Sequence, residues 1–590
     1  MDARPEAGRQ AGPLSRAVGI AAALALLAPA AAAASPHEER DRKVLSARSA
    51  AAASWAEMTT RERRAATRRE MEGRRKRFAR ARAAAPRTAR AVGRWGRPFT
   101  ISERYRGYAI HAAMLRTGKV LFYGYPLRPE HPGFRGNETY AWLWNPARGR
   151  GKRAFKDVTV RDRAGRIVSI YCSGMSFLPD GRLLIVGGNK VWPAAKPDDE
   201  YRDFAGLNRA FIFDPGTERW TEVPRPEGSR GRWYPGQVMF ADGRTLVIAG
   251  LTEEAPGGVH NEGLEIYNPP TAANPAGSFE LLTDPAQVRR TDPYPHLFVL
   301  PNDMVALAGP DTTDHALFDP NSLQAPWTEL GRQSIQRIGG NAVLLPRGPR
   351  GSYDVLQVAG EPYDERPLDT TERTDFSKSI PTWRAGPELH IRRSYPNTVL
   401  LPNQGLVVVG GIDKGRNYTP RGRQVELLGR GAGSFRLGPA QTEDRGYHST
   451  TLLLPDGRVL SAGDDLNPTS DGSYKNSSPF DTAEIYSPPY LFKGSRPVIR
   501  RAPRTVRYGS RFTVSTGSRV AGALLAAPSA VTHGADMTQR LVPLRVAGRT
   551  GRSVTLVGPP EAGVAPPGWY MLFVSDGKNR PSKAKFVRLR

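Results

Sequence analysis

Cysteine is almost absent from this 590-residue sequence, which contains a single one, Cys172. A lone thiol cannot close a disulfide within its own chain, so a scaffold held by internal disulfides is excluded. The thiol is free, modified or bonded to another molecule. Its default interpretation is a small buried apolar residue. The neighbours of Cys172 in the fold decide whether it has a chemical role instead.

Long apolar runs are also missing. The run from Ala17 to Ala28 is too short for a comfortable membrane span. It follows a basic stretch and precedes the small residues Ala32 to Ala34, which is the arrangement of a secretory signal peptide. We therefore expect residues 1–35 to be an export signal, either cleaved or kept as an anchor. The protein is predicted to be secreted or extracytoplasmic, and associated with the cell surface if the anchor is retained.

Acidic residues are scarce from Pro36 to Arg97, where 19 lysines and arginines face 7 aspartates and glutamates. Thr59 to Ala81 has a helical composition but lacks a continuous apolar stripe. Residues 36–97 are therefore predicted to be a basic helical or disordered segment. In an exported chain its expected partner is an anionic cell-wall polymer or membrane surface, and not nucleic acid. A solvated spacer is the alternative.

Long helical patterns are scarce too, because glycine and proline are frequent, at 61 and 52 residues. From about Phe99 a unit recurs: an apolar strand, a turn resembling Pro-Asp-Gly, a second apolar strand and a closing glycine. The copies begin at His111, Cys172, Tyr234, Tyr294, Gly340, Tyr395 and Tyr447. Asp-Gly between apolar runs indicates a hairpin. A spacing of roughly 45 to 62 residues is typical of propeller blades. Residues 98–494 are thus predicted to form a seven-bladed kelch-type β-propeller.

The pattern changes after Arg496 and Pro497. Short alternating segments with turns between them, such as RFTVST, SVTLVGP and WYMLFVSD, replace the hairpin repeat. Such segments are typical of a β-sandwich. Residues 495–590 are therefore predicted to be an immunoglobulin-like (early-set) β-sandwich, and the whole chain is assigned to the all-β class.

Aligning the hairpins on their turns brings chemically reactive side chains to one structural position. The aligned residues are Ala109, Cys172, Tyr234, Tyr294, Gly339, Tyr395 and His448, with Tyr447 directly before the last. First strands of a propeller begin near its central axis, so these side chains converge. A thiol, phenols and an imidazole together suit a redox transition metal, and imidazole-rich tetragonal sites favour Cu(II). A C-terminal loop that dips along the axis would add a second imidazole, from His533.

These motifs resemble the copper-radical oxidases, the family of galactose oxidase and glyoxal oxidase. The resemblance rests on Cys172 in YCSG, Tyr234 in RWYPG, Tyr447 and His448 in RGYHSTTLLLPDGRV, and His533 in THGADMTQR. It implies a thioether radical cofactor made from Cys172 and Tyr234, and one copper per chain. The implied copper ligands are Tyr234, Tyr447, His448 and His533. Tyr447 would also be the general base, the Tyr234 radical would abstract a hydrogen from the substrate carbon, and dioxygen would leave as hydrogen peroxide.

Departures from galactose oxidase bear on the substrate. That enzyme stacks a tryptophan on its thioether shortly after its tyrosine, and the corresponding stretch here, AGLTEEAPGG, has none. A basic segment stands where a carbohydrate-binding domain would precede the propeller. The stretches YPHLFVLP and DLNPTSD look more like the glyoxal-oxidase branch. The expected substrates are small aldehydes, oxidised as hydrates, primary alcohols or hydroxy-aldehydes.

Other interpretations of these residues stay open. Tyr-Pro also opens two further hairpins, so Tyr234 alone fits plain repeat architecture. Tyr294, His296 and Tyr395 are expected mainly to pack the blades, and four histidines are expected to be structural or exposed: His111, His260, His315 and His390. The alternative function is a non-catalytic propeller that binds a cell-wall glycan or a protein. A hydrolase with paired carboxylates is disfavoured, since no Asp or Glu occupies an aligned position.

Overall fold

The structure is a computed structural model that describes residues 88–590, apart from 102–106, 126–137, 192–203, 255–258, 310–312, 334, 363–365, 413–418 and 465–480. Before residue 88 it describes only positions 59, 61, 62, 72, 75, 76 and 79. The predicted export signal, residues 1–35, and most of the basic segment therefore lie outside the described residues. Among the residues that are described, no helix is long and apolar enough to cross a membrane.

Seven antiparallel sheets, the blades, follow one another along the described chain. Blade 1 contains β3 (His111–Met114), β4 (Val120–Gly124), β5 (Tyr140–Trp144) and β6 (Phe155–Asp157). Blades 2 to 4 contain β7 (Gly174–Phe177), β8 (Leu183–Val186), β11 (Ala210–Asp214) and β12 (Arg219–Val223); β13 (Gly236–Met239), β14 (Thr245–Ile248), β15 (Leu264–Asn268) and β16 (Ser278–Leu282); and β17 (Leu297–Val299), β18 (Val305–Ala308), β19 (Asp314–Phe318) and β20 (Trp327–Arg332).

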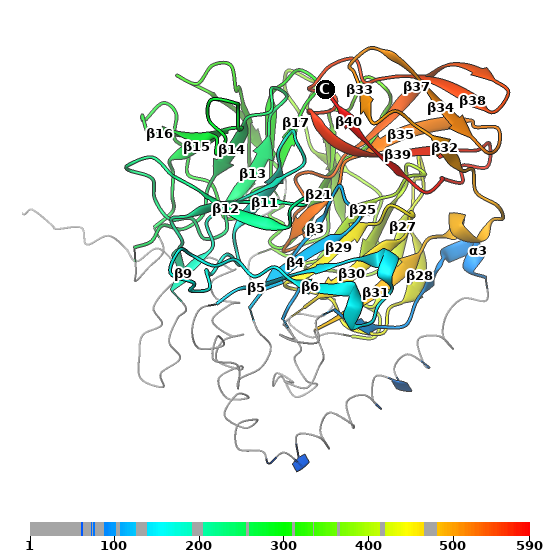
Figure 1. Cartoon of the computed structure of the whole chain (residues 1–590), viewed down its shortest axis with the longest axis horizontal. Helices are drawn as coiled ribbons and strands as arrows, with labels where there is room; N and C mark the ends of the chain where they lie inside the picture. Colours follow the sequence, from blue (N-terminus) through cyan, green and yellow to red (C-terminus); the bar gives the residue numbers. More distant parts are fainter. Residues whose placement is uncertain are drawn as a thin grey trace, which may run out of the picture. The chain divides into compact units, whose positions relative to one another are not determined.

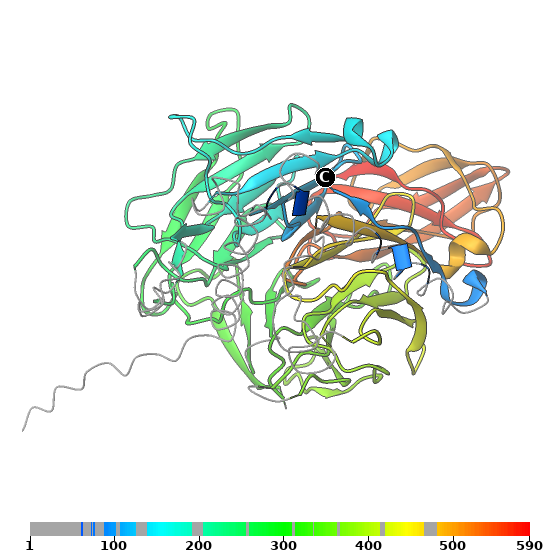
Figure 2. The ribbon, with the colours of Figure 1, turned by 90° about the horizontal axis from the view of Figure 1, so that it is seen from below.

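Blades 5 and 6 contain β21 (Asn341–Leu344), β22 (Asp354–Val358), β23 (Thr371–Asp375) and β24 (Arg384–Ala385); and β25 (Asn397–Leu400), β26 (Leu406–Val409), β27 (Gln424–Leu428) and β28 (Arg436–Ala440). Blade 7 contains β29 (Ser449–Leu453), β30 (Val459–Gly463) and β31 (Thr482–Ser487). A two-stranded sheet, β9 (Asn189–Val191) with β10 (Ala205–Gly206), lies within blade 2's sequence. Figure 2 shows the blades succeeding one another from cyan through green to yellow.

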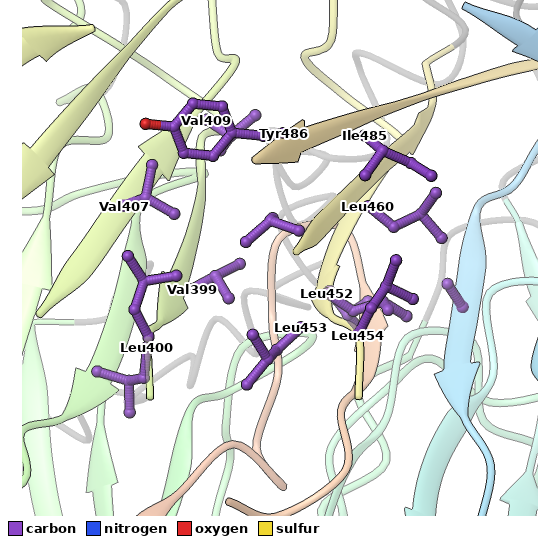
Figure 3. Close-up of a cluster of buried hydrophobic side chains, with 14 of the residues drawn as sticks. Val399, Leu400, Val407, Val409, Leu452, Leu453, Leu454, Leu460, Ile485 and Tyr486 are labelled. Carbon is purple, nitrogen blue, oxygen red and sulfur yellow. The ribbon is translucent and has the colours of Figure 1, made fainter. Parts of the chain in front are cut away.

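Hairpin turns start the blades as the sequence predicts. In blade 2 the Leu178 amide donates to the Arg182 carbonyl at 2.8 Å across the turn, and Gly181 adopts a φ of 86°. The positive φ explains the preference for glycine at this turn position. The second strands are completely buried, because neighbouring blades pack against both of their faces. Figure 3 shows such a contact, in which Val399 and Val407 of blade 6 and Leu452 of blade 7 belong to one cluster.

The last blade is completed by the start of the described chain. Strands β1 (Arg94–Trp95) and β2 (Phe99–Thr100) pair antiparallel with β31 of blade 7. The preceding turn of helix, α3 (Ala89–Val92), is attached as well, since the Tyr486 hydroxyl donates to the Val92 carbonyl at 2.5 Å. A blade built from both ends of the repeat region closes the propeller.

The C-terminal sheet runs in the order β32 (Ile499–Arg501), β34 (Arg511–Thr516), β38 (Ser553–Val557), β37 (Leu541–Thr550), β35 (Gly522–Ala526), β39 (Gly568–Ser575), β40 (Lys585–Leu589) and β33 (Thr505–Val506). The long strand β37 serves both halves, because it pairs with β35 first and with β38 afterwards. The sheet thereby encloses its own apolar core. Figure 1 shows these strands in orange to red beside the blades. The predicted fold class, a seven-bladed propeller followed by a β-sandwich, is confirmed.

One strand leaves the C-terminal domain and joins the propeller. Strand β36 (Ala530–Thr532) pairs antiparallel with β3, the first strand of blade 1, in a register that places Thr532 opposite His111. His533 follows directly. The segment that follows β36 is also anchored to the blades, since the Arg540 guanidinium donates to the Val299 carbonyl at 2.5 Å. The fold thus carries a C-terminal histidine to the start of a first strand.

Candidate metal centre

The residue that the hairpin alignment places just before each first strand is called the axial residue here. The axial residues Cys172, Tyr234, Tyr294, Gly339, Tyr395 and His448 all have a left-handed backbone, with φ between 49° and 63°. Positive φ is uncommon for residues with side chains, so its recurrence reveals one shared turn at the start of these blades. In blade 1, Ala109 is not in the left-handed region.

Three donor atoms surround the Tyr234 hydroxyl. Tyr234 Oη lies 2.5 Å from Tyr447 Oη, 2.7 Å from His533 Nε2 and 3.2 Å from His448 Nε2. All four residues are buried, and Tyr234 and Tyr447 are 0% exposed. The structure therefore brings together two phenols and two imidazoles from blades 3 and 7 and the C-terminal domain.

The thiol belongs to the same cluster. Cys172 is 1% exposed, and its Sγ and ring nitrogens of His448 and His533 all lie within 4.8 Å of one another. Cys172 and Tyr234 are also joined through the backbone, because the Tyr234 amide donates to the Cys172 carbonyl at 2.9 Å. All five residues singled out from the sequence thus lie together. Imidazole, phenol and thiol donors suit a redox-active transition metal.

Aromatic rings cover Tyr234. The Trp233 ring stacks on it, with centroids 3.6 Å apart and planes 9° apart, and Phe204 stacks on Trp233. Our expectation of a site without a stacked tryptophan was therefore wrong. The tryptophan precedes the tyrosine instead of following it, and with the left-handed turn at Tyr234 its side chain lies over the tyrosine ring. The motif RWYPG contained this signal.

Two residues expected mainly to pack the blades also contact the site. The Tyr294 ring stacks on Tyr234 at a centroid distance of 4.4 Å and lies 4.7 Å from His533. The Tyr395 ring meets Tyr447 edge-on at 5.1 Å. His296 is buried. The axial tyrosines of blades 4 and 6 thus line the centre, and the Tyr294 hydroxyl donates to the Ser173 carbonyl at 3.1 Å.

Both imidazoles are oriented through their second nitrogen. His448 Nδ1 lies 3.3 Å from the Tyr125 hydroxyl, and His533 Nδ1 lies 2.7 Å from Thr532 Oγ1. Such bonds fix the ring and leave Nε2 for a metal. Tyr125 was missed from the sequence. It follows the closing glycine of blade 1, which returns the chain to the end where first strands begin.

His111 was expected to be structural or exposed, and it is fully buried beside the centre. Its Nε2 accepts a hydrogen bond from the Cys172 amide at 2.8 Å, and its ring stacks on Tyr123 at 4.1 Å. Burial holds the pKa of His111 well below its usual value, so the ring is neutral. Among the other histidines grouped with it, His315 is buried in blade 4 and His390 is exposed.

A buried ion pair supports several axial turns, and the sequence analysis missed it. Arg232 lies two residues before Tyr234, donates to the Ala249 carbonyl at 2.8 Å and pairs with Glu265 at 3.2 Å. The same arrangement recurs in blades 5 and 6, with Arg337 and Glu372, and Arg393 and Glu426. Arginine two residues before the axial residue was visible in RWYPG and RSYPN.

Fold and site together define a class: a closed β-propeller with a buried phenol, imidazole and thiol centre completed by a C-terminal β-sandwich domain. The family model of the galactose oxidase-like early set domain matches residues 496–589. A galactose oxidase of Gibberella zeae is 27% identical over 84% of this chain and 71% of its own length. The aldehyde oxidase GLOX of Vitis pseudoreticulata is 28% identical over 72% of this chain and 82% of its own.

The fold has a solved counterpart. A fungal alcohol oxidase of the AA5 family, solved in complex with copper, superposes with a TM-score of 0.67 at 23% identity, over 84% of this chain and 99% of its own. These similarities support the copper-radical oxidase family for this chain.

Proposed function

We propose that the chain binds one copper ion through Tyr234, Tyr447, His448 and His533, and oxidises small aldehydes as their hydrates, primary alcohols or hydroxy-aldehydes. Dioxygen is the second substrate and is reduced to hydrogen peroxide. A thioether between Cys172 and Tyr234 completes the proposed cofactor. The observation that carries the proposal is that one phenol oxygen, of Tyr447, and two imidazole nitrogens, of His448 and His533, lie within 2.5 to 3.2 Å of Tyr234 Oη.

The donor set fits copper. Imidazole nitrogens with phenolic oxygens suit a tetragonal Cu(II) site, whereas Ca²⁺ and Mg²⁺ prefer carboxylate and carbonyl oxygens. In the described part of the chain, the metal-ligand cluster at this position contains a thiol and two imidazoles and no carboxylate. Bound copper would supply a one-electron acceptor, and the linked Tyr234–Cys172 unit would supply the second.

Tyr447 is the proposed general base. It is fully buried, and its Oη lies 2.5 Å from Tyr234 Oη. A substrate hydroxyl that enters this space would give its proton to Tyr447 Oη, and the linked Tyr234 unit, once formed, would supply the acceptor for the hydrogen of the adjacent carbon. The rings of Trp233 and Tyr294, stacked on Tyr234, would shield it from water.

The surroundings of the donors favour a small substrate. The rings of Trp233, Tyr294 and Tyr395 lie against the two tyrosine donors. A hexose needs a wall of polar donors, whereas an aldehyde hydrate needs few contacts. The similarity to a plant aldehyde oxidase over 82% of that enzyme's length adds support. Because Trp233 stacks on Tyr234, the lack of a stacked tryptophan no longer speaks against galactose, and a direct comparison of substrates is decisive.

The test combines metal analysis, intact mass and a peroxide-coupled assay. Copper-loaded protein should contain one copper per chain, lose two hydrogens on cross-linking and show a tyrosyl-radical absorption band. Peroxide should form in step with oxygen use, faster with glyoxal, methylglyoxal or glycolaldehyde than with galactose at equal concentration. Galactose as the best substrate would overturn the substrate class alone. Absence of copper binding would overturn the oxidase and favour a glycan-binding or protein-binding propeller.

Secretion and surface attachment are part of the proposal. Residues 36–97, with 19 basic and 7 acidic residues, would hold the exported enzyme at an anionic cell-wall or membrane surface. Cosedimentation with anionic and neutral vesicles, and with anionic cell-wall polymer, compares full-length protein with a variant whose arginines at 61, 63, 64, 68 and 69 are glutamine. Equal binding of both proteins would contradict the role of this segment.

A further inference from the structure

Backbone hydrogen bonds connect successive axial residues. The Tyr234 amide donates to the Cys172 carbonyl at 2.9 Å, and the Tyr294 amide donates to the Tyr234 carbonyl at 2.8 Å. In the same way, the Tyr395 amide donates to the Gly339 carbonyl at 2.6 Å. The main chain of the preceding blade thus provides the acceptor that fixes these axial turns.

Cys172 departs from this rule. Its amide donates to a side chain, His111 Nε2, at 2.8 Å. The axial residue of the preceding blade, Ala109, is not left-handed, and its carbonyl accepts instead from Thr450 Oγ1 at 3.2 Å. An imidazole therefore takes the place of the main-chain acceptor at the one axial residue that carries sulfur.

His111 is itself held in place from two sides. Its ring stacks on Tyr123 with planes 7° apart, and the Tyr123 hydroxyl lies 2.9 Å from Ser173 Oγ, next to Cys172. Along β3 it is the register partner of Thr532, directly before His533. His111 Nδ1 has no hydrogen-bond partner among the described residues. The bond to Cys172 is thus the polar contact that a substitution of His111 removes.

We propose that His111 is a positioning residue that holds Cys172 for thioether formation with Tyr234. The inference rests on the proposed function. In that reaction the S–H bond of Cys172 and one ring C–H bond of Tyr234 beside its hydroxyl break, and one C–S bond forms. The two electrons and two protons released reduce one dioxygen to hydrogen peroxide. A left-handed turn fixed by His111 keeps the sulfur at the ring, so that a single product forms.

The test uses full-length protein prepared without copper, to which Cu(II) and air are added. The loss of two hydrogens is followed by intact mass, and the joined Cys172 and Tyr234 peptides by tryptic mapping. His111→Gln keeps an acceptor at the position of Nε2, whereas His111→Asn keeps the amide but shortens its reach. We expect His111→Gln to cross-link within about twofold of the wild-type rate and His111→Asn about tenfold slower, the factor that corresponds to 1.4 kcal/mol.

Copper content and melting temperature are measured on every variant, so that slow cross-linking at equal copper occupancy identifies positioning. His315→Asn, which changes a buried histidine in blade 4, should cross-link at the wild-type rate. Equal rates for His111→Asn and wild type would overturn the role of His111 alone. If wild-type protein binds copper and never forms the link, the proposed cofactor falls together with this role. If His111→Asn does not fold, a slow His111→Gln with normal copper content also overturns the proposal.

Discussion

Blades 3 and 6 present almost the same turn to the axis and use it differently. Each has an axial tyrosine followed by proline, with φ of 63° at Tyr234 and 55° at Tyr395, and each has a buried arginine two residues earlier. The Tyr234 hydroxyl lies among three other donor atoms, whereas the Tyr395 ring contacts Tyr447 edge-on. The repeat therefore determines where an axial tyrosine lies. The neighbouring blades and the C-terminal segment with His533 determine which donor atoms surround its hydroxyl.

The largest expected difference between the blades is in copper affinity, and it appears when the proposed histidine ligands are replaced. His448→Ala and His533→Ala are each expected to lower copper affinity by about 1000-fold, or about 4 kcal/mol, without unfolding the blades. Tyr395→Phe should keep full copper occupancy. Metal analysis after dialysis and thermal unfolding measure both effects. Full copper occupancy in the double histidine variant would refute the ligand assignment.

Substitution of the buried arginines tests what the shared turn contributes to stability and to the metal centre in each blade. Arg393→Met leaves Glu426 buried without its partner guanidinium and should lower the free energy of unfolding by about 3 kcal/mol. Arg232→Met leaves Glu265 paired with Arg225 and should cost less. Only Arg232→Met should also alter the electron paramagnetic resonance spectrum of bound copper, because it supports Tyr234. Denaturant unfolding and spectra at equal copper content separate the two outcomes. Identical spectral changes in both variants would contradict the difference between the blades.

Cys172 is a further difference between the two tyrosines, because no thiol is available to link to Tyr395. Cys172→Ser should still bind copper, and its kcat should fall about 100-fold, equivalent to about 2.7 kcal/mol of barrier. The radical would sit on an unmodified phenol of higher potential. Peptide mapping of wild type should show the two peptides joined by a bond that reducing agents leave intact. Peptides that separate freely after copper treatment would refute the thioether.

A smaller effect is expected at Tyr125. Tyr125→Phe removes the hydroxyl beside His448 Nδ1 and should weaken copper binding about tenfold, as for other bonds that orient a ligand. Tyr490→Phe, which removes a buried hydroxyl bonded to the Gly457 carbonyl, is the matched control. Competition with a copper chelator measures both. Unchanged affinity in Tyr125→Phe would show that His448 is oriented by its blade alone.

A dependence of stability on pH is expected at Asp536, in the segment after β36 that carries His533. Burial raises the pKa of Asp536 from 3.8 to about 6. The folded state therefore binds a proton that the unfolded state releases, and stability should fall as pH rises from about 4 to about 6. Asp536→Asn should flatten this part of the stability profile. Parallel profiles for the two proteins would contradict the raised pKa.

Much of the architecture could be predicted because each hairpin is a local signal. The Asp-Gly turns fix the blade register, and that register alone aligns Cys172 with Tyr234 and His448. His533 was found from its motif, although nothing local indicates that β36 pairs with β3. Trp233, Tyr125 and His111 depend on contacts between segments far apart or on the direction of a turn, and these contacts exist only after the propeller closes.

The excursion of β36 sets an order of events during synthesis. The ribosome makes the chain from the N-terminus, so Cys172, Tyr234, Tyr447 and His448 exist before His533 does. The propeller blades can assemble while the last donor is still absent. A nascent or truncated chain that ends after blade 7 holds the thiol and both phenols but only one of the two imidazoles. With the proposed ligands, copper capture at full strength would be reserved for finished chains, and the proposed centre would be completed last.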